Sequence, residues 1–285
     1  MRTRHFSQFP KPYTAYPNII KGLVLKKKGL LQTLPDVEYV VDAFHVHARH
    51  LHAYNEICGF DNNGYIPAIY FAVLSQSLQM HMMTEEPFPF AILGLVHIHN
   101  QVTQYRPLAA NLQYQLSCKF GELKPHAKGV QFEFITQVKI GDEVVMEGVS
   151  TYLSRQKTKG VADKNNHRTV QTPDYVLQDT WQIPENIGRR YAFISGDANI
   201  IHLHALTAKA FGFKRAIAHG MWSKAKALAN LELPEKYQAE VHFKLPIFLP
   251  SNVEFLTALQ APRTDFLIQQ QQTSKPHLIG HVTAL

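Results

Sequence analysis

The feature that most constrains the fold is an order of secondary-structure signals that occurs twice along the chain. In the first half, a strand-like run at 37–48 is followed by a stretch at 66–83 whose apolar residues recur with a helical period. Four β-rich runs bounded by Pro, Gly and Asp come next. In the second half, a helical candidate at 218–231 again precedes four β-rich runs. One buried helix followed by an antiparallel meander, twice over, predicts a duplicated α+β unit in which a sheet wraps around a helix.

A polar and basic segment separates the two halves. Residues 154–168 contain few large apolar side chains, which is typical of a linker. We therefore expect an N-terminal repeat at 1–153, a basic linker at 154–172 and a C-terminal repeat at 173–285. The length of 285 residues is enough for two such domains.

Composition excludes several classes of protein. The two cysteines, Cys58 and Cys118, cannot form a disulfide framework and indicate a reducing compartment, which we expect to be the cytoplasm. No apolar run is long enough for a membrane span. The formal charge of +7 comes from small groups of basic residues. Because these groups form no long block or stripe, we expect no nucleic-acid partner. They fit either a solvated surface or attraction of an anionic substrate.

The stretch SGDANIIHLH at 195–204 places Ser195, Asp197, Asn199, His202 and His204 within ten positions among apolar neighbours. Ser and Asp are favoured helix N-caps, so the stretch could simply start a short helix that runs to Ala210. A second interpretation is chemical. If a turn of helix begins near Asp197, His202 lies a little over one turn further on, where both side chains can hold one water. A carboxylate and an imidazole around one water form a general acid–base pair, which Asn199 or Ser195 could orient.

The stretch IAHGM at 217–221 offers the complementary electrophile site. Gly220 stands where the apolar helical segment begins, so its N–H lacks a partner within the helix and carries the positive end of the helix dipole. A thioester carbonyl bound to that amide would be polarised toward an enolate, and glycine lets it approach closely.

Residues 191–221 closely resemble the signature of the MaoC-like dehydratases, the (R)-specific enoyl-CoA hydratase group of the hot-dog fold. The matching positions are Tyr191, Ala192, Ser195, Gly196, Asp197, Asn199, His202, Gly212, Phe213 and 217–221. Segments 67–83 and 88–102 resemble the N-terminal half of two-hot-dog members. The resemblance implies a double hot-dog fold and an enzyme of fatty acid metabolism. Such a hydro-lyase interconverts trans-2-enoyl and (R)-3-hydroxyacyl thioesters of CoA or acyl carrier protein, without a cofactor or a metal.

The resemblance also implies a role for each site residue. Asp197 and His202 hold the catalytic water and exchange protons, and the Gly220 amide binds the thioester oxygen. Four further residues are expected to contact substrate: Ser195, Asn199, His219 and Met221. In the first repeat Asp61 is followed five positions later by Ile66 rather than histidine, so we expect that repeat to give room for the acyl tail while the second carries the chemistry.

Two positions depart from the family pattern. Ile200 replaces the usual proline, which could loosen the turn that presents His202, and His204 replaces the usual aspartate. Neither change removes a proposed proton-transfer group.

Other constellations are weaker. His45 and His47 would face the same side of the strand expected at 37–48, as a metal pair would, but no cysteine or carboxylate completes an obvious ligand set.

Two other functions stay open: a thioesterase of the same fold, and a non-catalytic subunit that binds acyl thioesters. The two repeats can pair within one chain, or two chains can form a homodimer.

Overall fold

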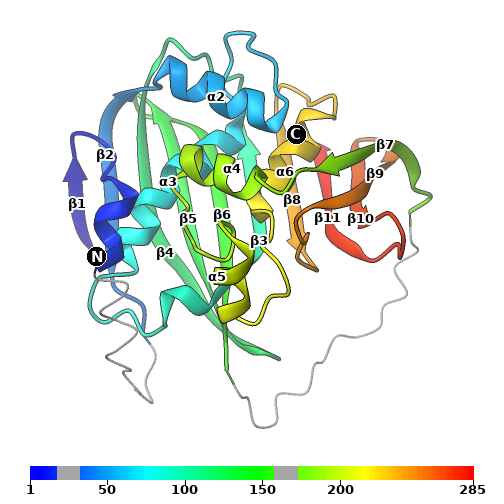
Figure 1. Ribbon diagram of the computed structural model, residues 1–285. Coiled ribbons are helices and arrows are strands. Elements are labelled where there is room, and N and C mark those ends of the chain that lie inside the picture. The colour runs from blue at the N-terminus through cyan, green and yellow to red at the C-terminus, as the bar shows by residue number, and fades with distance from the viewer. Residues whose placement is uncertain (18–32, 157–172) are drawn as a thin grey trace.

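The computed structural model describes residues 1–17, 33–156 and 173–285, in which one sheet of eleven strands supports all the helices (Figure 1). The strands are β1 (Arg2–Phe6), β2 (Val37–His45), β3 (Leu95–Gln104), β4 (Gln113–His126), β5 (Gly129–Ile140), β6 (Glu143–Arg155), β7 (Val176–Ile183), β8 (Tyr237–Phe243), β9 (Ser251–Gln260), β10 (Arg263–Gln270) and β11 (Pro276–Ala284). The helices are α2 (Ala48–Cys58), α3 (Ala68–Met82), α4 (Ile187–Ser195), α5 (Ala205–Ala210) and α6 (Gly220–Ala229), with short 3-10 turns η1 (Pro12–Ala15) and η2 (Ile92–Gly94).

The sheet order shows where the two halves of the chain meet. It runs β1-β2-β4-β5-β6-β3-β8-β11-β10-β9-β7, so β3 of the first half pairs with β8 of the second. The pairing is antiparallel and joins His99–Gln104 to Tyr237–His242. We call this β3–β8 junction the seam. Apart from the parallel β1–β2 pair, the neighbouring strands are antiparallel.

Helices α3 and α6 pack on the same face of the sheet, with α2 and α4 over them (Figure 1). Helix α3 is buried almost throughout and packs against β3, β4 and β5, because its residues are apolar on every side. Helix α6 packs against β11 and α2. One helix against each half of a wrapped antiparallel sheet is the α+β architecture expected from the repeated signals.

The structure confirms the helices predicted within 66–83 and 218–231, but it corrects the strand expected at 37–48. Strand β2 ends at His45, and His47 is the N-cap of α2. The two histidines therefore do not share a strand face, and a metal pair on that strand is ruled out. Glycine at position 59, with φ of +91°, ends α2 in the left-handed conformation typical of a helix C-cap.

Further expectations concern the linker and the cysteines. Most of the predicted linker, residues 157–172, lies outside the described residues, and the division into 1–153, 154–172 and 173–285 stays a prediction. Cys58 and Cys118 are both free thiols in the core. Within the described ranges, no helix combines the length and the apolar character that crossing a bilayer requires.

Candidate active site

The loop that carries Asp197 follows a helix instead of starting one. Helix α4 ends at Ser195, and Gly196 adopts φ of +75°, a left-handed conformation that glycine takes without strain. A side-chain atom at Gly196 would also lie only 2.6 Å from Pro12 of the N-terminal segment. A turn therefore stands where the sequence also allowed a short helix from Asp197, and the next helix, α5, begins only at Ala205.

Local hydrogen bonds hold this turn. The Asp197 N–H donates to Ser195 Oγ at 3.2 Å, and the Asn199 N–H donates to Asp197 Oδ1, also at 3.2 Å. The His202 N–H then donates to the Asn199 carbonyl at 3.0 Å. This succession of short-range turns, which Asp and Asn favour, brings the His202 side chain back toward Asp197.

Asp197, His202 and His219 form one compact cluster, whose side-chain oxygen and ring nitrogens lie within 4.8 Å of one another. The rings of His202 and His219 stack with centroids 3.7 Å apart. His219 Nε2 donates to the Asp197 carbonyl at 3.1 Å and lies 3.8 Å from the Asp197 carboxylate. His202 Nδ1 donates to the Ile217 carbonyl at 2.8 Å, which leaves its Nε2 as the ring nitrogen with a free lone pair.

Burial and mutual contact set the charge states of the cluster. Burial lowers the pKa of His202, and the Asp197 carboxylate opposes this only in part. Burial and the adjacent His202 also lower the pKa of His219. Burial raises the pKa of the Asp197 carboxyl, but His219, His202 and a hydrogen bond from Gln76 more than offset it, so the pKa lies below its ordinary value. At neutral pH the cluster therefore holds a carboxylate and neutral imidazoles, the charge states suited to accepting a proton.

Gly220 is the first residue of α6, with His219 as its N-cap. Its N–H precedes the first turn of the helix and has no carbonyl within the helix to bond to. A Cβ at this position would lie 2.8 Å from Cε1 of Phe243, so glycine is needed for β8 and the helix start to approach. The amide is thus presented beside the cluster with the helix dipole behind it.

A cavity of about 330 Å³ opens over these groups. Its lining includes Gln76, His97, Tyr152, Arg155, Tyr191, Asp197, Asn199, His202, His219, Gly220, Met221, Phe243 and Lys244. Several lining residues have a buried polar atom without a hydrogen-bond partner in the described part of the chain: His97 Nε2, Tyr191 OH, His219 Nδ1 and His277 Nε2. Buried polar groups normally find partners. Their concentration here marks a place where a polar ligand or water belongs.

The structure brings together six of the seven residues that the sequence singles out. Asp197, Asn199, His202, His219, Gly220 and Met221 all line the cavity. Ser195 lies behind the Asp197 backbone, in the turn described above, and is not part of the cavity wall.

Residues of the first repeat complete the site, and no pattern in the sequence indicated them. The Gln76 side chain, from α3, hydrogen-bonds to Asp197, and His97, from β3, stacks on the Tyr152 ring with centroids 4.5 Å apart. Burial holds the pKa of His97 at about 3, so this imidazole is neutral. Gln76 and His97 lie 100 positions or more before Asp197, and no local pattern links them to it.

The two departures from the family pattern have local explanations. His204 is the N-cap of α5, and its Nδ1 accepts a hydrogen bond from the Leu206 N–H at 3.2 Å, as an aspartate there would do. Ile200 keeps the turn without proline, since its carbonyl accepts from Thr207 Oγ1 at 2.6 Å and from the Leu203 N–H at 3.3 Å.

Comparison with known proteins agrees with this site. Residues 165–276 match the MaoC like domain family. The 3-hydroxyacyl-thioester dehydratase X of Mycobacterium tuberculosis is 30% identical over 281 residues, which cover 94% of this chain and 99% of that protein. The chain belongs to the MaoC-like dehydratase family. The predicted family and the enzyme class, hydro-lyase, are thereby confirmed.

Solved MaoC-like structures share the fold. The crystal structure of HtdX from Mycobacterium tuberculosis superposes with a TM-score of 0.76 at 29% identity, covering 87% of this chain and all 100% of that one. A MaoC-like dehydratase from Phytophthora capsici gives a TM-score of 0.70 at 18% identity, covering 89% of this chain and 96% of that chain. A further Mycobacterium tuberculosis protein with a double hot-dog fold gives a TM-score of 0.56 at 11% identity, covering 86% and 95%. The predicted double hot-dog fold is confirmed.

Proposed function

We propose that this MaoC-like protein hydrates trans-2-enoyl thioesters reversibly to (R)-3-hydroxyacyl thioesters, with Asp197 and His202 as the proton-transfer pair. The observation that carries the proposal is the juxtaposition of this pair with the free amide of Gly220 in one cavity. Hydration of an enoyl thioester needs both the proton-transfer pair and the amide. Water must lose a proton as it adds, and the carbonyl oxygen must receive negative charge.

Each group has a defined task in this reaction. A water held by Asp197 and His202 gives a proton to the free Nε2 of His202 as its oxygen forms a bond to C3 of the enoyl group. The electrons of the double bond move onto the thioester oxygen, where the Gly220 amide and the dipole of α6 stabilise them. Return of the proton to C2 from the same side restores the thioester and makes the addition syn. Elimination of water follows the same steps in reverse.

The cavity also supports an anionic carrier for the acyl group. Arg155 and Lys244 both belong to its lining, and each keeps a charged head group exposed. The phosphates of CoA or of an acyl carrier protein arm suit such a pair. The choice between the two carriers, a homodimer in solution and a cytoplasmic location stay predictions, as does a reaction that uses no cofactor or metal.

The first test follows crotonyl-CoA and a longer trans-2-enoyl-CoA by the loss of their conjugated absorbance, with free thiol measured in parallel. Loss of conjugation without thiol release is the expected result. Thiol release would instead identify a thioesterase. If neither signal changes, the acyl carrier protein thioesters are tested next, and no reaction with them would leave a binding role.

Variants assign the chemistry to residues. Asp197→Asn and His202→Ala should each lower kcat by about two orders of magnitude or more, because each removes a proton-transfer group. Asp61→Asn is the matched control, since this exposed carboxylate precedes helix α3 in the first repeat. It should retain full activity. Near wild-type rates in either Asp197→Asn or His202→Ala, with the fold intact by circular dichroism, would remove the pair from the mechanism.

A further inference from the structure

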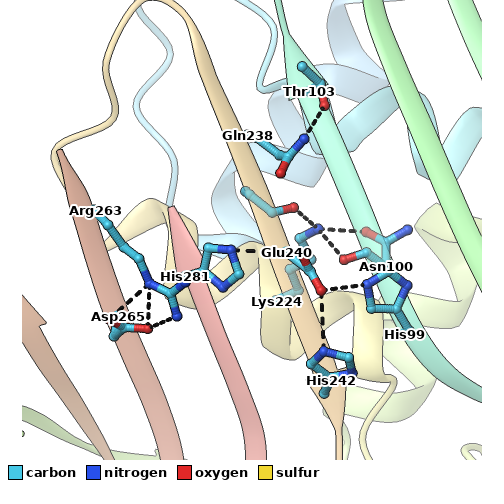
Figure 2. A network of polar contacts seen from close by, with 11 residues as sticks. His99, Asn100, Thr103, Lys224, Gln238, Glu240, His242, Arg263, Asp265 and His281 are labelled. Carbon is cyan, nitrogen blue, oxygen red and sulfur yellow. Dashed lines mark hydrogen bonds and ion pairs between the residues drawn. The ribbon is translucent and has the colours of Figure 1, made fainter. Parts of the chain in front are cut away.

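A second group of histidines lies on the opposite face of the sheet from the cavity. His99 on β3, Glu240 and His242 on β8, and His281 on β11 converge there (Figure 2). Side chains alternate between the faces of a strand. Since Asn100 and Val241 are buried under the helices, their neighbours His99, Glu240 and His242 point away from them.

The geometry of this group centres on the Glu240 carboxylate. Oε1 of Glu240 lies 3.0 Å from His99 Nε2 and 3.2 Å from His242 Nε2, and Oε2 lies 3.7 Å from His281 Nε2. The ligand atoms of His99, Glu240 and His242 all lie within 4.8 Å of one another. A tetrahedral zinc ion with bonds of about 2.0–2.2 Å separates its ligand atoms by roughly 3.4 Å. The side chains therefore need to move only slightly to surround an ion.

Neighbouring contacts already orient one of these rings. Nδ1 of His99 lies 3.3 Å from Thr151 Oγ1 on β6, so the ring directs its Nε2 at Glu240. Orientation of a histidine through its other nitrogen is a feature of zinc ligands in proteins. His99, Glu240 and His281 are only 20–24% exposed, while His242 is 52% exposed and leaves the group open to solvent on one side.

We propose that His99, Glu240 and His242 bind a divalent transition-metal ion of the zinc class at the outer face of the seam, with His281 or water as the fourth ligand. Two or three imidazoles and a carboxylate form a donor set that binds zinc and related transition-metal ions. This site is separate from the proposed reaction, because the sheet stands between it and the cavity.

The position of the group gives the ion a structural effect. His99 belongs to the first half of the chain, and the other three residues belong to the second. An ion held by both halves would link β3 to β8 and β11 across the seam. Because an ion that binds only the folded state adds its binding free energy to stability, zinc should raise the melting temperature.

The experiment uses the full-length chain without an affinity tag, stripped with EDTA and dialysed. Zinc chloride is titrated by calorimetry, and the melting temperature is measured with and without zinc. We expect one zinc ion per chain and a rise in melting temperature. His242→Ala and Glu240→Gln should each lower the affinity at least about tenfold and abolish the thermal shift. His281→Ala should have a smaller effect, because water can replace a fourth ligand.

His52→Ala is the matched control, since it removes one exposed imidazole on α2 that lies 3.4 Å from Glu56. Its zinc affinity should equal that of the wild type. Replacement by cobalt provides a second readout, because a tetrahedral His/Glu site shows visible absorption that His242→Ala should abolish. No zinc binding by the wild type, or unchanged affinity in both His242→Ala and Glu240→Gln, would overturn the proposal. Loss of binding in His219→Gln alone would do so too, by moving the ion to the cavity.

Discussion

The imidazole ring of His219 lies against the ring of His202, with ring centroids 3.7 Å apart and planes inclined by 24°. Two positive charges at this separation inside a cavity would repel strongly, so the pair cannot hold two protons at moderate pH. His219 in turn donates to the backbone of Asp197. His219 therefore contacts both residues: it bonds to the backbone of Asp197, and its ring disfavours a proton on His202.

This relationship predicts the acid limb of the pH–rate profile. His202 must be neutral to accept a proton from water, and its pKa lies below the ordinary value of 6.5. Protonation as pH falls through the lowered pKa removes the base, so kcat/KM for hydration should hold at pH 6.5 and decline only below it. Asp197, whose pKa is also lowered, stays ionised over this range. An acid limb centred at or above pH 6.5 would contradict the charge states derived for the cluster.

From the contact between Gln76 and Asp197 we predict that the first repeat takes part in catalysis. Gln76→Leu removes a hydrogen bond to the Asp197 carboxylate, so the pKa of Asp197 should rise and kcat should fall at least about tenfold. The measurement is the pH dependence of kcat. Gln79→Leu is the control on the same helix, since Gln79 bonds to Ser75 and Tyr152 and not to Asp197. It should leave the pH dependence unchanged.

Because Phe243 lies close to Gly220, we predict that a larger residue does not fit at the start of α6 without movement. In Gly220→Ala the added methyl would lie 2.8–2.9 Å from ring atoms of Phe243, so the helix start and β8 must move apart. We expect a loss of about 1–3 kcal/mol in the free energy of unfolding, together with weaker polarisation of substrate by the displaced amide. Urea denaturation measures the first effect. Gly94→Ala adds the same methyl where no atom lies within 4 Å and should keep the stability of the wild type.

The hydrogen bonds of Lys224 predict that this side chain holds α6 on the seam. Its fully buried Nζ donates to the Asn100 carbonyl, to Asn100 Oδ1 and to the Ala239 carbonyl at 2.7–3.0 Å, bridging α6 to both strands (Figure 2). Lys224→Met removes the donor of these three buried hydrogen bonds and should cost about 3 kcal/mol of unfolding free energy.

A matched substitution on the same helix checks this assignment. Lys226 Nζ lies 4.9 Å from the centre of the Trp181 ring and makes a cation–π contact. Lys226→Met should therefore cost only about 1 kcal/mol or less. Equal losses in Lys224→Met and Lys226→Met, measured by urea denaturation, would show that the bridge to the seam contributes little.

Local signals in the sequence predicted much of the fold and placed the residues of the proposed proton-transfer pair together. The apolar period of 66–83 forms α3, and the stretch that begins near Gly220 forms α6, because both helices are apolar enough to be buried wherever the sheet lies. Asp197, His202 and Gly220 are close together in the chain, so their spacing already indicated one site. The sequence left open a helical turn starting near Asp197, and the structure has none there, because Gly196 in the left-handed conformation ends α4.

By itself, then, the sequence determined the duplicated α+β architecture and the closeness of Asp197 to His202, since both depend on residues near one another in the chain. Only the tertiary structure decided what surrounds that pair and what lies behind it. An extra residue in β3 shifts its register against β6 between His97 and His99. Strict alternation would place these two histidines on one face, but the bulge turns His97 into the cavity and leaves His99 on the outer face beside Glu240. That choice depends on pairing with strands distant in the sequence, which no local pattern records.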